Sequence, residues 1–170
     1  MSEKHRRYFL KEKDSKNLLD KASQRFRVNL EQIFNEKTNI EIIETEHGDI
    51  CLIDGKPVFV RTQVDVYPAL VFSLLFNMMP KVTVDMGAVP FVCKGANIMA
   101  PGIKCFSGDF EKGDFVFIVD EKHGKPLALG EIVYDAEEVK SVKQGIVVKN
   151  KHYVGDNIWN ILKEFRAPFK

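Results

Sequence analysis

The chain has 170 residues, of which 45% are apolar and 29% charged, with a net charge of +1; this profile is typical of one folded domain or two small ones and excludes a largely disordered chain. The longest apolar run, residues 69–79, contains Ser73 and Asn77 and is far shorter than the roughly 20 residues that a membrane span needs. The basic first residues lack the apolar core of a secretory signal, so we expect a cytoplasmic protein with no membrane partner.

The first residues predict a short strand and an amphipathic helix. Residues 8–10 lie between basic residues, as edge strands often do. Asp14-Ser15 is the expected N-cap of the helix. The apolar positions of this helix, three and four residues apart, are Leu18, Leu19, Ala22 and Phe26, and its outer face carries Lys16, Lys21, Arg25 and Arg27. Residues 29–35 are expected to add one more helical turn.

Three strands and a second helix are expected to complete a small α+β domain over residues 1–79. The strands, joined by turns around Gly48 and Gly55, pair as an antiparallel meander and are predicted over residues 39–45, 50–53 and 57–62. Tyr67-Pro68 then opens a helix over residues 69–78 that is apolar almost all round and is expected to be buried. Pro80 ends this helix and marks the domain boundary.

Residues 81–102 predict two sharp reversals of the chain. An apolar alternation at Val82 and Val84 indicates a strand, and Gly87, Ala88 and Pro90 then open a short helix. Gly95 ends that helix, and a second strand follows over residues 97–100.

The remaining residues predict a second domain over 80–160, followed by a tail over 161–170. Four strands are expected, over residues 115–119, 127–134, 146–149 and 153–159. Asp135 is the expected N-cap of a short helix that reaches Gln144, with Glu138 completing a capping box. About six short strands with helical turns at the corners indicate a small closed or nearly closed barrel.

Three segments of the second domain carry a family resemblance: VDMGAVPFVCKGANIMAPGI, KGDFVFIVDE and LALGEIVYDAEEVKSVKQGIVVKNKHYVGDNIW. Together they resemble a PUA domain, which is an RNA-binding module. Among PUA-containing proteins they resemble the malignant-T-cell-amplified type of translation factor. The meander before them resembles the pre-PUA domain of an archaeal-like short form of that family. Many relatives have a cysteine where this chain has Ala100, which argues against a thiol role there.

The resemblance implies an α+β pre-PUA domain with an antiparallel sheet, followed by a PUA-type β-barrel, or pseudobarrel. It also implies partners: RNA such as tRNA or rRNA, the small ribosomal subunit, and a translation factor with an SUI-type domain. In PUA domains the short helix and the next strand line the RNA groove.

The candidate RNA site is centred on Lys94, whose charge lies beside a glycine that lets a phosphate approach the backbone. The candidate RNA-binding residues are Gly87, Lys94, Gly95, Ala96, Asn97, Lys104, Lys149, Lys151 and His152. The glycines can equally serve turn geometry alone, and Asn97 can tie the loop to itself. Arg25 and Arg27 would widen the groove if the domains pack suitably, and Trp159 fits either base stacking or the core.

The distribution of charge is compatible with an RNA surface. Residues 1–37 carry ten Lys or Arg against six Asp or Glu, residues 38–139 eight against sixteen, and residues 140–170 seven against two. Basic ends that meet in the fold would form a nucleic-acid surface, whereas solvated helix faces explain the same pattern without one.

Catalytic and metal-binding motifs are absent from the sequence. Cys51, Cys93 and Cys105 form no C-x-x-C pair and are expected to be buried apolar residues. No nucleophile-elbow, zinc-protease, P-loop or dinucleotide motif occurs. We therefore expect no enzyme, no metal and no cofactor, and a translation factor for re-initiation or tRNA handling. The alternatives are an accessory subunit of an RNA-modification or ribosome-biogenesis complex, and a protein adaptor that no longer binds RNA.

Overall fold

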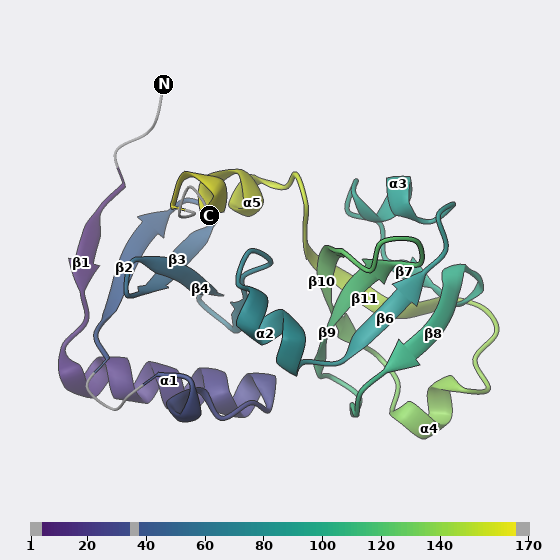
Figure 1. Cartoon of the computed structure of the whole chain (residues 1–170), viewed down its shortest axis with the longest axis horizontal. Helices are drawn as coiled ribbons and strands as arrows, with labels where there is room; N and C mark the ends of the chain where they lie inside the picture. Colours follow the sequence, from purple (N-terminus) through teal and green to yellow (C-terminus); the bar gives the residue numbers. More distant parts are fainter. Residues whose placement is uncertain (1–4, 35–37, 166–170) are drawn as a thin grey trace.

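The computed structural model describes residues 5–34 and 38–165, and it contains two β-sheets that lie side by side, each with its own helices (Figure 1). The first sheet is an antiparallel meander whose strands, in spatial as in chain order, are β1 (Arg7–Phe9), β2 (Ile40–Thr45), β3 (Gly48–Ile53), β4 (Lys56–Arg61) and β5 (Val66–Pro68). The helix α1 (Glu12–Phe26) and the 3-10 turn η1 (Leu30–Gln32) bury their apolar side chains against this sheet. The edge strand, the amphipathic helix and the meander are thus confirmed.

The start of α1 differs from the prediction. The helix begins at Glu12 with Lys11 as its N-cap, and no side chain caps it. Ser15 lies inside the helix and is buried, and its Oγ accepts a hydrogen bond of 3.1 Å from the N–H of Ile40. The hydroxyl therefore ties α1 to β2 instead of capping the helix.

The segment after β4 also differs from the prediction. Residues 66–68 continue the sheet as β5, and the N–H of Ala69 donates to the Val58 carbonyl at 3.0 Å. The helix α2 spans only Ser73–Met78. Leu75 is buried, but Leu74 and Met78 are about half exposed on the outer side, so the expectation of a helix buried all round is wrong.

The second sheet curls around a core of its own into an open barrel, as expected. Its spatial order is β7-β11-β10-β9-β6-β8, with β6 (Lys81–Val84), β7 (Ile98–Met99), β8 (Ile103–Ser107), β9 (Phe115–Asp120), β10 (Pro126–Ile132) and β11 (Ile146–Tyr153). The short helices α3 (Val89–Val92) and α4 (Ala136–Val139) lie at opposite ends of this barrel (Figure 1). The 3-10 turn η2 (Ala100–Gly102) joins the edge strands β7 and β8, of which β8 was not predicted.

Asp135 corrects the predicted capping box. It precedes α4, but its side chain makes no cap hydrogen bond and instead accepts one of 2.7 Å from the N–H of Lys112. The helix accordingly stops at Val139, well before Gln144.

The predicted strand over residues 153–159 is wrong. β11 runs unbroken to Tyr153, and the chain then forms the helix α5 (Asn157–Leu162) and the 3-10 turn η3 (Lys163–Phe165). Ile158 and Leu162 pack in one cluster with Ile43, Ile50 and Val60 of the first sheet. The predicted boundary at residue 160 therefore falls inside a helix that returns to the first sheet.

The two sheets share one hydrophobic cluster. The ring of Phe26, at the end of α1, makes edge contacts with Phe59 of β4 and Phe115 of β9, with centroids 6.1 and 6.2 Å apart. Phe117 and Leu129 of the barrel belong to the same cluster. The barrel is therefore packed against the first domain rather than tethered to it.

Arg25 crosses the same boundary with polar contacts. Its guanidinium pairs with Asp65 at 3.0 Å and with Glu131 at 2.7 Å, and it donates to the Gly113 carbonyl at 2.8 Å. The guanidinium also lies 3.9 Å from the centroid of the Phe115 ring. One side chain thus joins α1, the first sheet and the barrel.

Arg25→Met is expected to lower the free energy of unfolding by about 2 kcal/mol, because Asp65 and Glu131 would remain partly buried without their partner. Arg6→Met is the matched control, since the Arg6–Glu44 pair is mostly exposed and is worth about 0.5 kcal/mol or less. Urea unfolding of both variants measures the difference. Equal losses would show that Arg25 does not join the domains.

Gly130 allows β10 and β11 to approach closely at a bulge of the barrel. A Cβ atom on Gly130 would lie 2.3 Å from Val148 Cγ1 and 2.7 Å from the Lys149 carbonyl oxygen. No side chain fits there without a shift of the β11 backbone.

Gly130→Ala is therefore expected to lower the free energy of unfolding by about 1–3 kcal/mol. Gly87→Ala serves as the control, because its Cβ would meet only Asp85 Oδ1, at 3.3 Å, and the loss should stay below about 1 kcal/mol. Thermal unfolding with circular dichroism detection compares the two. A Gly130→Ala protein as stable as the control would refute this packing argument.

Candidate nucleic-acid interface

The α3 end of the barrel holds most of the predicted site. The chain leaves β6 at Val84 and turns at Asp85, whose Oδ1 accepts a hydrogen bond of 2.9 Å from the N–H of Ala88. The helix α3 follows and carries Pro90 in its first turn. The predicted strand, turn and helix are confirmed here.

The two glycines beside α3 differ in what they require. Gly95 has a φ of +94°, and a Cβ there would lie 3.0 Å from the Tyr153 ring. Both its backbone conformation and its packing against β11 therefore favour glycine. Gly87 is exposed and does not have a positive φ, so turn geometry does not explain this residue.

Two asparagines fix the loop that follows α3. Asn97 Oδ1 accepts a hydrogen bond of 3.0 Å from the N–H of Asn150 in β11. The side-chain amide of Asn150 donates to the carbonyls of Val92 and Ala96 at 3.1 and 3.0 Å. Asn97 thus holds the loop against β11, while its side chain and Ala96 remain exposed. Asn150 was missed by the sequence analysis, because a lone asparagine in a strand gives no signal of its partner.

The four predicted lysines are exposed but do not form one row. Lys94 follows α3, and Lys104 and Lys151 are the extra residues of bulges in β8 and β11. Lys149 lies opposite Glu131, midway along the barrel. Within residues 5–34 and 38–165, Lys140 is the only lysine whose amine pairs with a carboxylate, so these four amines keep their charge available.

His152 is the clear correction among the predicted site residues. Its side chain is fully buried between the domains, 2.8 Å from Asp156 Oδ2 through Nδ1 and 5.5 Å from the Tyr67 ring between centroids. Burial alone would raise the pKa of Asp156, but hydrogen bonds from His152, Trp159 N–H and Tyr153 N–H outweigh it and hold that pKa below its ordinary value. His152 therefore cannot contact an RNA in this fold.

Two other expected contributions to the groove are also absent. Arg25 is engaged between the domains, and Arg27 pairs with Asp114 at 2.7 Å and with Glu111 at 3.7 Å. Trp159 lies in α5 and packs against the shared cluster, with Lys163 Nζ 4.5 Å from its ring centroid. Neither arginine nor Trp159 extends the α3 end.

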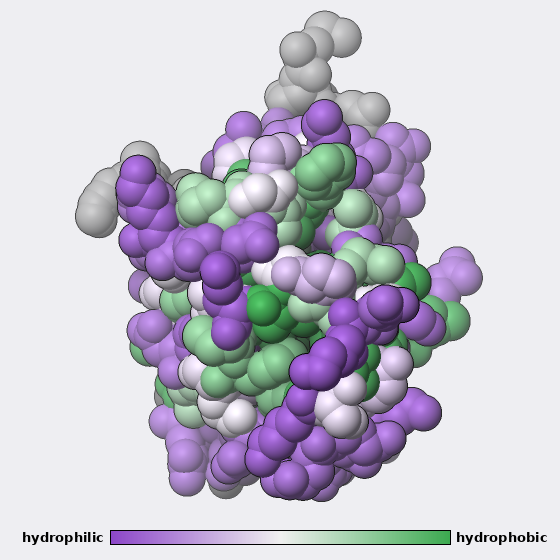
Figure 2. Space-filling model, turned by 90° about the vertical axis from the view of Figure 1, so that its right-hand side faces the viewer, coloured by the Kyte–Doolittle hydropathy of each residue, from purple (hydrophilic) through white to green (hydrophobic). Residues whose placement is uncertain are grey.

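Exposed apolar side chains accompany the lysines of the barrel. Phe91, in α3, is 65% exposed. Met86, Met99 and Ile146 are also exposed, by 40–46%. Figure 2 shows the barrel end of the molecule, on which hydrophobic residues gather in the centre with hydrophilic residues around them.

A basic turn at the same end was missed by the sequence analysis. The strand registers place residues 121–125, between β9 and β10, beside the loop that leads to α3. Lys122, His123 and Lys125 are exposed in this turn. The sequence signalled only a hairpin turn, because the position of that turn beside α3 depends on the parallel pairing of β6 and β9.

The two ends of the barrel therefore differ in their balance of lysines and carboxylates. The lysines at the α3 end are Lys94, Lys104, Lys122, Lys125 and Lys151, against the carboxylates Asp85, Asp120 and Glu121. These three carboxylates each accept backbone N–H groups of the loops, and none of the five lysines pairs with a carboxylate among residues 5–34 and 38–165. At the α4 end the carboxylates Asp109, Glu111, Asp114, Asp135, Glu137 and Glu138 face the cations Arg27, Lys81, Lys112, Lys140 and Lys143, so this end is nearly neutral.

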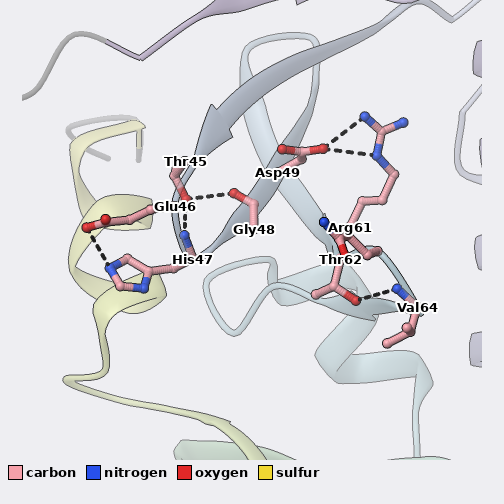
Figure 3. A pocket seen from close by; sticks show the side chains of 9 residues that line it. Thr45, Glu46, His47, Gly48, Asp49, Arg61, Thr62 and Val64 are labelled. Carbon is pink, nitrogen blue, oxygen red and sulfur yellow. Dashed lines mark hydrogen bonds and ion pairs between the residues drawn. The ribbon is translucent and has the colours of Figure 1, made fainter.

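A depression of about 630 Å³ on the first domain is less suited to a ligand. It lies between the β2–β3 turn and the β4–β5 turn, and Figure 3 shows that its charged side chains contact each other. Arg61 pairs with Asp49 at 3.0 Å, and His47 lies 3.4 Å from Glu46. Its polar groups already have partners, so nothing there requires a further one.

Two kinds of feature are absent from the described part of the chain, residues 5–34 and 38–165. No three His, Cys, Asp or Glu side chains come together in a way that could hold a metal ion. No helix there is both long and apolar enough to cross a membrane.

Comparison with known families divides the chain near Pro80. A family described as "PUA domain" matches residues 80–154, and one described as "Domain of unknown function (DUF1947)" matches residues 6–75. The barrel with α3 corresponds to the first match and the meander with α1 to the second.

Two solved structures share the whole arrangement. A hypothetical protein of Pyrococcus horikoshii superimposes with a TM-score of 0.77 at 32% identity, covering 92% of this chain and 99% of that one. A conserved PUA domain protein of Thermoplasma acidophilum gives a TM-score of 0.68 at 26% identity, with the same coverage of 92% and 99%.

Three relatives show the family. An uncharacterized protein of Methanocaldococcus jannaschii is 39% identical, over 91% of this chain and 96% of its own length. Translation machinery-associated protein 20 of Saccharomyces cerevisiae is 34% identical, over 79% of both chains. Malignant T-cell-amplified sequence 1 of Danio rerio is 32% identical, over 78% of this chain and 76% of its own. The chain therefore belongs to the family of PUA-domain proteins that includes translation machinery-associated protein 20 and malignant T-cell-amplified sequence 1.

Proposed function

We propose that this protein is a non-catalytic RNA-binding translation factor that holds tRNA at the small ribosomal subunit in the cytoplasm. The RNA contacts the α3 end of the barrel through Lys94, Lys104 and Lys151, beside the loop that Asn97 fixes. Gly95 and Ala96 let the phosphodiester backbone approach that loop. Lys149 lies farther from α3 on β11, so only an RNA long enough to extend along that strand contacts it.

The observation that carries this proposal is the difference in charge between the two ends of the barrel. Five lysines without a carboxylate partner among the described residues gather at the α3 end, whereas carboxylates of the α4 end pair with Arg27 and Lys140. Each phosphate that a lysine neutralises releases condensed counterions, so this end attracts RNA more strongly than the nearly neutral α4 end does. A surface of this kind orients an RNA without reading its sequence.

The relatives support the biological setting. One of them is named for its association with the translation machinery. A PUA domain without a catalytic partner in the same chain fits a factor that positions RNA. The contacts of Arg25 and Phe26 favour a rigid two-domain body, so placement of the RNA relative to the ribosome is the proposed mechanism.

The first domain is assigned the protein-facing role. It carries exposed apolar side chains at Phe9 and Val64 and, one helical turn apart on α2, at Leu74 and Met78. Such side chains suit a protein surface better than a phosphate backbone. A translation factor with an SUI-type domain is the proposed partner.

Lys94→Glu is expected to weaken tRNA binding about tenfold at 100 mM KCl and to reduce the slope of log K against log [KCl] by about one unit. Lys143→Glu makes the same charge change outside the α3 end, between α4 and β11, and should leave both quantities unchanged. Filter binding at several KCl concentrations measures both variants, with tRNA carrying an intact or a trimmed 3′ end.

Co-sedimentation with small ribosomal subunits is measured with the same proteins. If wild-type protein binds neither tRNA nor subunits above a neutral control protein, the proposed function is wrong. Equal losses of tRNA affinity for Lys94→Glu and Lys143→Glu would show that the RNA does not bind at the α3 end.

A further inference from the structure

We propose that the turn between β9 and β10, residues 121–125, is a second phosphate-binding element, so that the ligand is a structured RNA whose backbone bridges α3 and this turn. This inference rests on the proposed function and specifies the class of RNA. A single unpaired end that reaches only α3 would not need the turn, whereas a stem presents phosphates to both.

A buried carboxylate organises the turn from below. Asp120, at the end of β9, is 4% exposed, and its oxygens accept hydrogen bonds from the N–H groups of Lys122 at 3.0 Å, of Lys125 at 3.3 Å and of His123. The N–H of Gly124 donates to the Asp120 carbonyl at 3.0 Å. The N–H groups of residues 122–125 therefore point toward Asp120, and the side chains of Lys122, His123 and Lys125 are exposed.

Asp120 stays ionised in this arrangement. Burial alone would raise its pKa, but the backbone hydrogen bonds from His123, Lys125 and Lys122 and the nearby His123 ring outweigh burial and hold the pKa below its ordinary value. The carboxylate thus anchors the turn at neutral pH, and it is shielded by the N–H groups around it.

The turn is also fixed to the predicted site. The N–H of Glu121 donates to the Val84 carbonyl at 3.0 Å, and Glu121 Oε2 accepts a hydrogen bond of 2.8 Å from the N–H of Met86. Met86 immediately precedes Gly87 in the loop that leads to α3. The basic turn is therefore held against the loop before α3, and Lys94 follows the same helix, so a rigid RNA that spans the α3 end can contact both without rearrangement of the protein.

The backbone hydrogen bonds of the turn determine how it can bind a phosphate. Because the N–H groups of residues 122–125 are engaged with Asp120, the turn can bind a phosphate only through the side chains of Lys122, His123 and Lys125, while the exposed Glu121 carboxylate is held by the N–H of Met86. Flexible lysines bind phosphates as point charges, without the fixed geometry that reads a base. The turn should therefore add affinity that depends on salt and tolerates any sequence.

The test is the double variant Lys122→Glu/Lys125→Glu, measured with a tRNA transcript and with a single-stranded RNA that matches its 3′ end. Affinity for the tRNA should fall about tenfold or more at 100 mM KCl, and the salt slope should decrease by one to two units, at about one unit per phosphate contact. Affinity for the single strand should change less than about twofold, because it does not reach the turn.

Lys140→Glu/Lys143→Glu is the matched control, since it makes the same change of charge in and after α4. Thermal unfolding of both proteins confirms that they are folded. The control should bind tRNA like the wild type.

The inference is wrong if the turn variant binds tRNA like the control, if both double variants lose affinity equally, or if the turn variant loses affinity equally for tRNA and for the single strand. If Lys94→Glu still weakens binding in the first case, the proposed function stands and only the second element is wrong. Loss of small-subunit co-sedimentation with unchanged tRNA binding would assign the turn to another partner and would likewise overturn it.

Discussion

The packing of Phe26 is the contact on which the rest of the structure depends. Its ring fills the space between Phe59 of the first sheet and Phe115 of the barrel, and Arg25, one residue earlier, pairs with carboxylates of both domains. The end of α1 thus fixes the orientation of the two sheets together with the contacts of His152 on Tyr67 and of α5 on the first sheet. Without that orientation the α3 end of the barrel would have no fixed position relative to the first domain, and the protein could not hold an RNA in a fixed position relative to a partner of that domain.

The sequence predicted those parts of the fold that short-range patterns determine. The meander followed from its glycine turns, and α1 followed from its apolar spacing. The errors have a common physical cause, which is that tertiary contacts overrode local signals. Ser15 has the chemistry of a cap but bonds to Ile40, and the strand-forming residues near Trp159 form a helix because Ile158 and Leu162 find an apolar face on the first sheet.

For the candidate site, chemistry was easier to predict than accessibility. Lys94 and Gly95 lie where the resemblance placed them, beside α3. His152, only one residue from Lys151, is buried because it follows the bulge in β11 and packs on Tyr67 of the first domain. Asn150 and the basic turn depend on strand register and on the parallel β6–β9 pair, which no local pattern encodes.

The return of α5 to the first sheet has a consequence for how the protein is made. The face formed by Ile43, Ile50 and Val60 is covered only when Ile158 and Leu162 arrive, more than ninety residues later in the chain. During synthesis the domain that emerges first therefore exposes an apolar face while the whole barrel is still being translated. The barrel, whose strands lie within residues 81–153, can close before the earlier domain is complete. The first domain is thus synthesised before the barrel but completed after it. The nascent first domain is therefore the part that needs protection from aggregation.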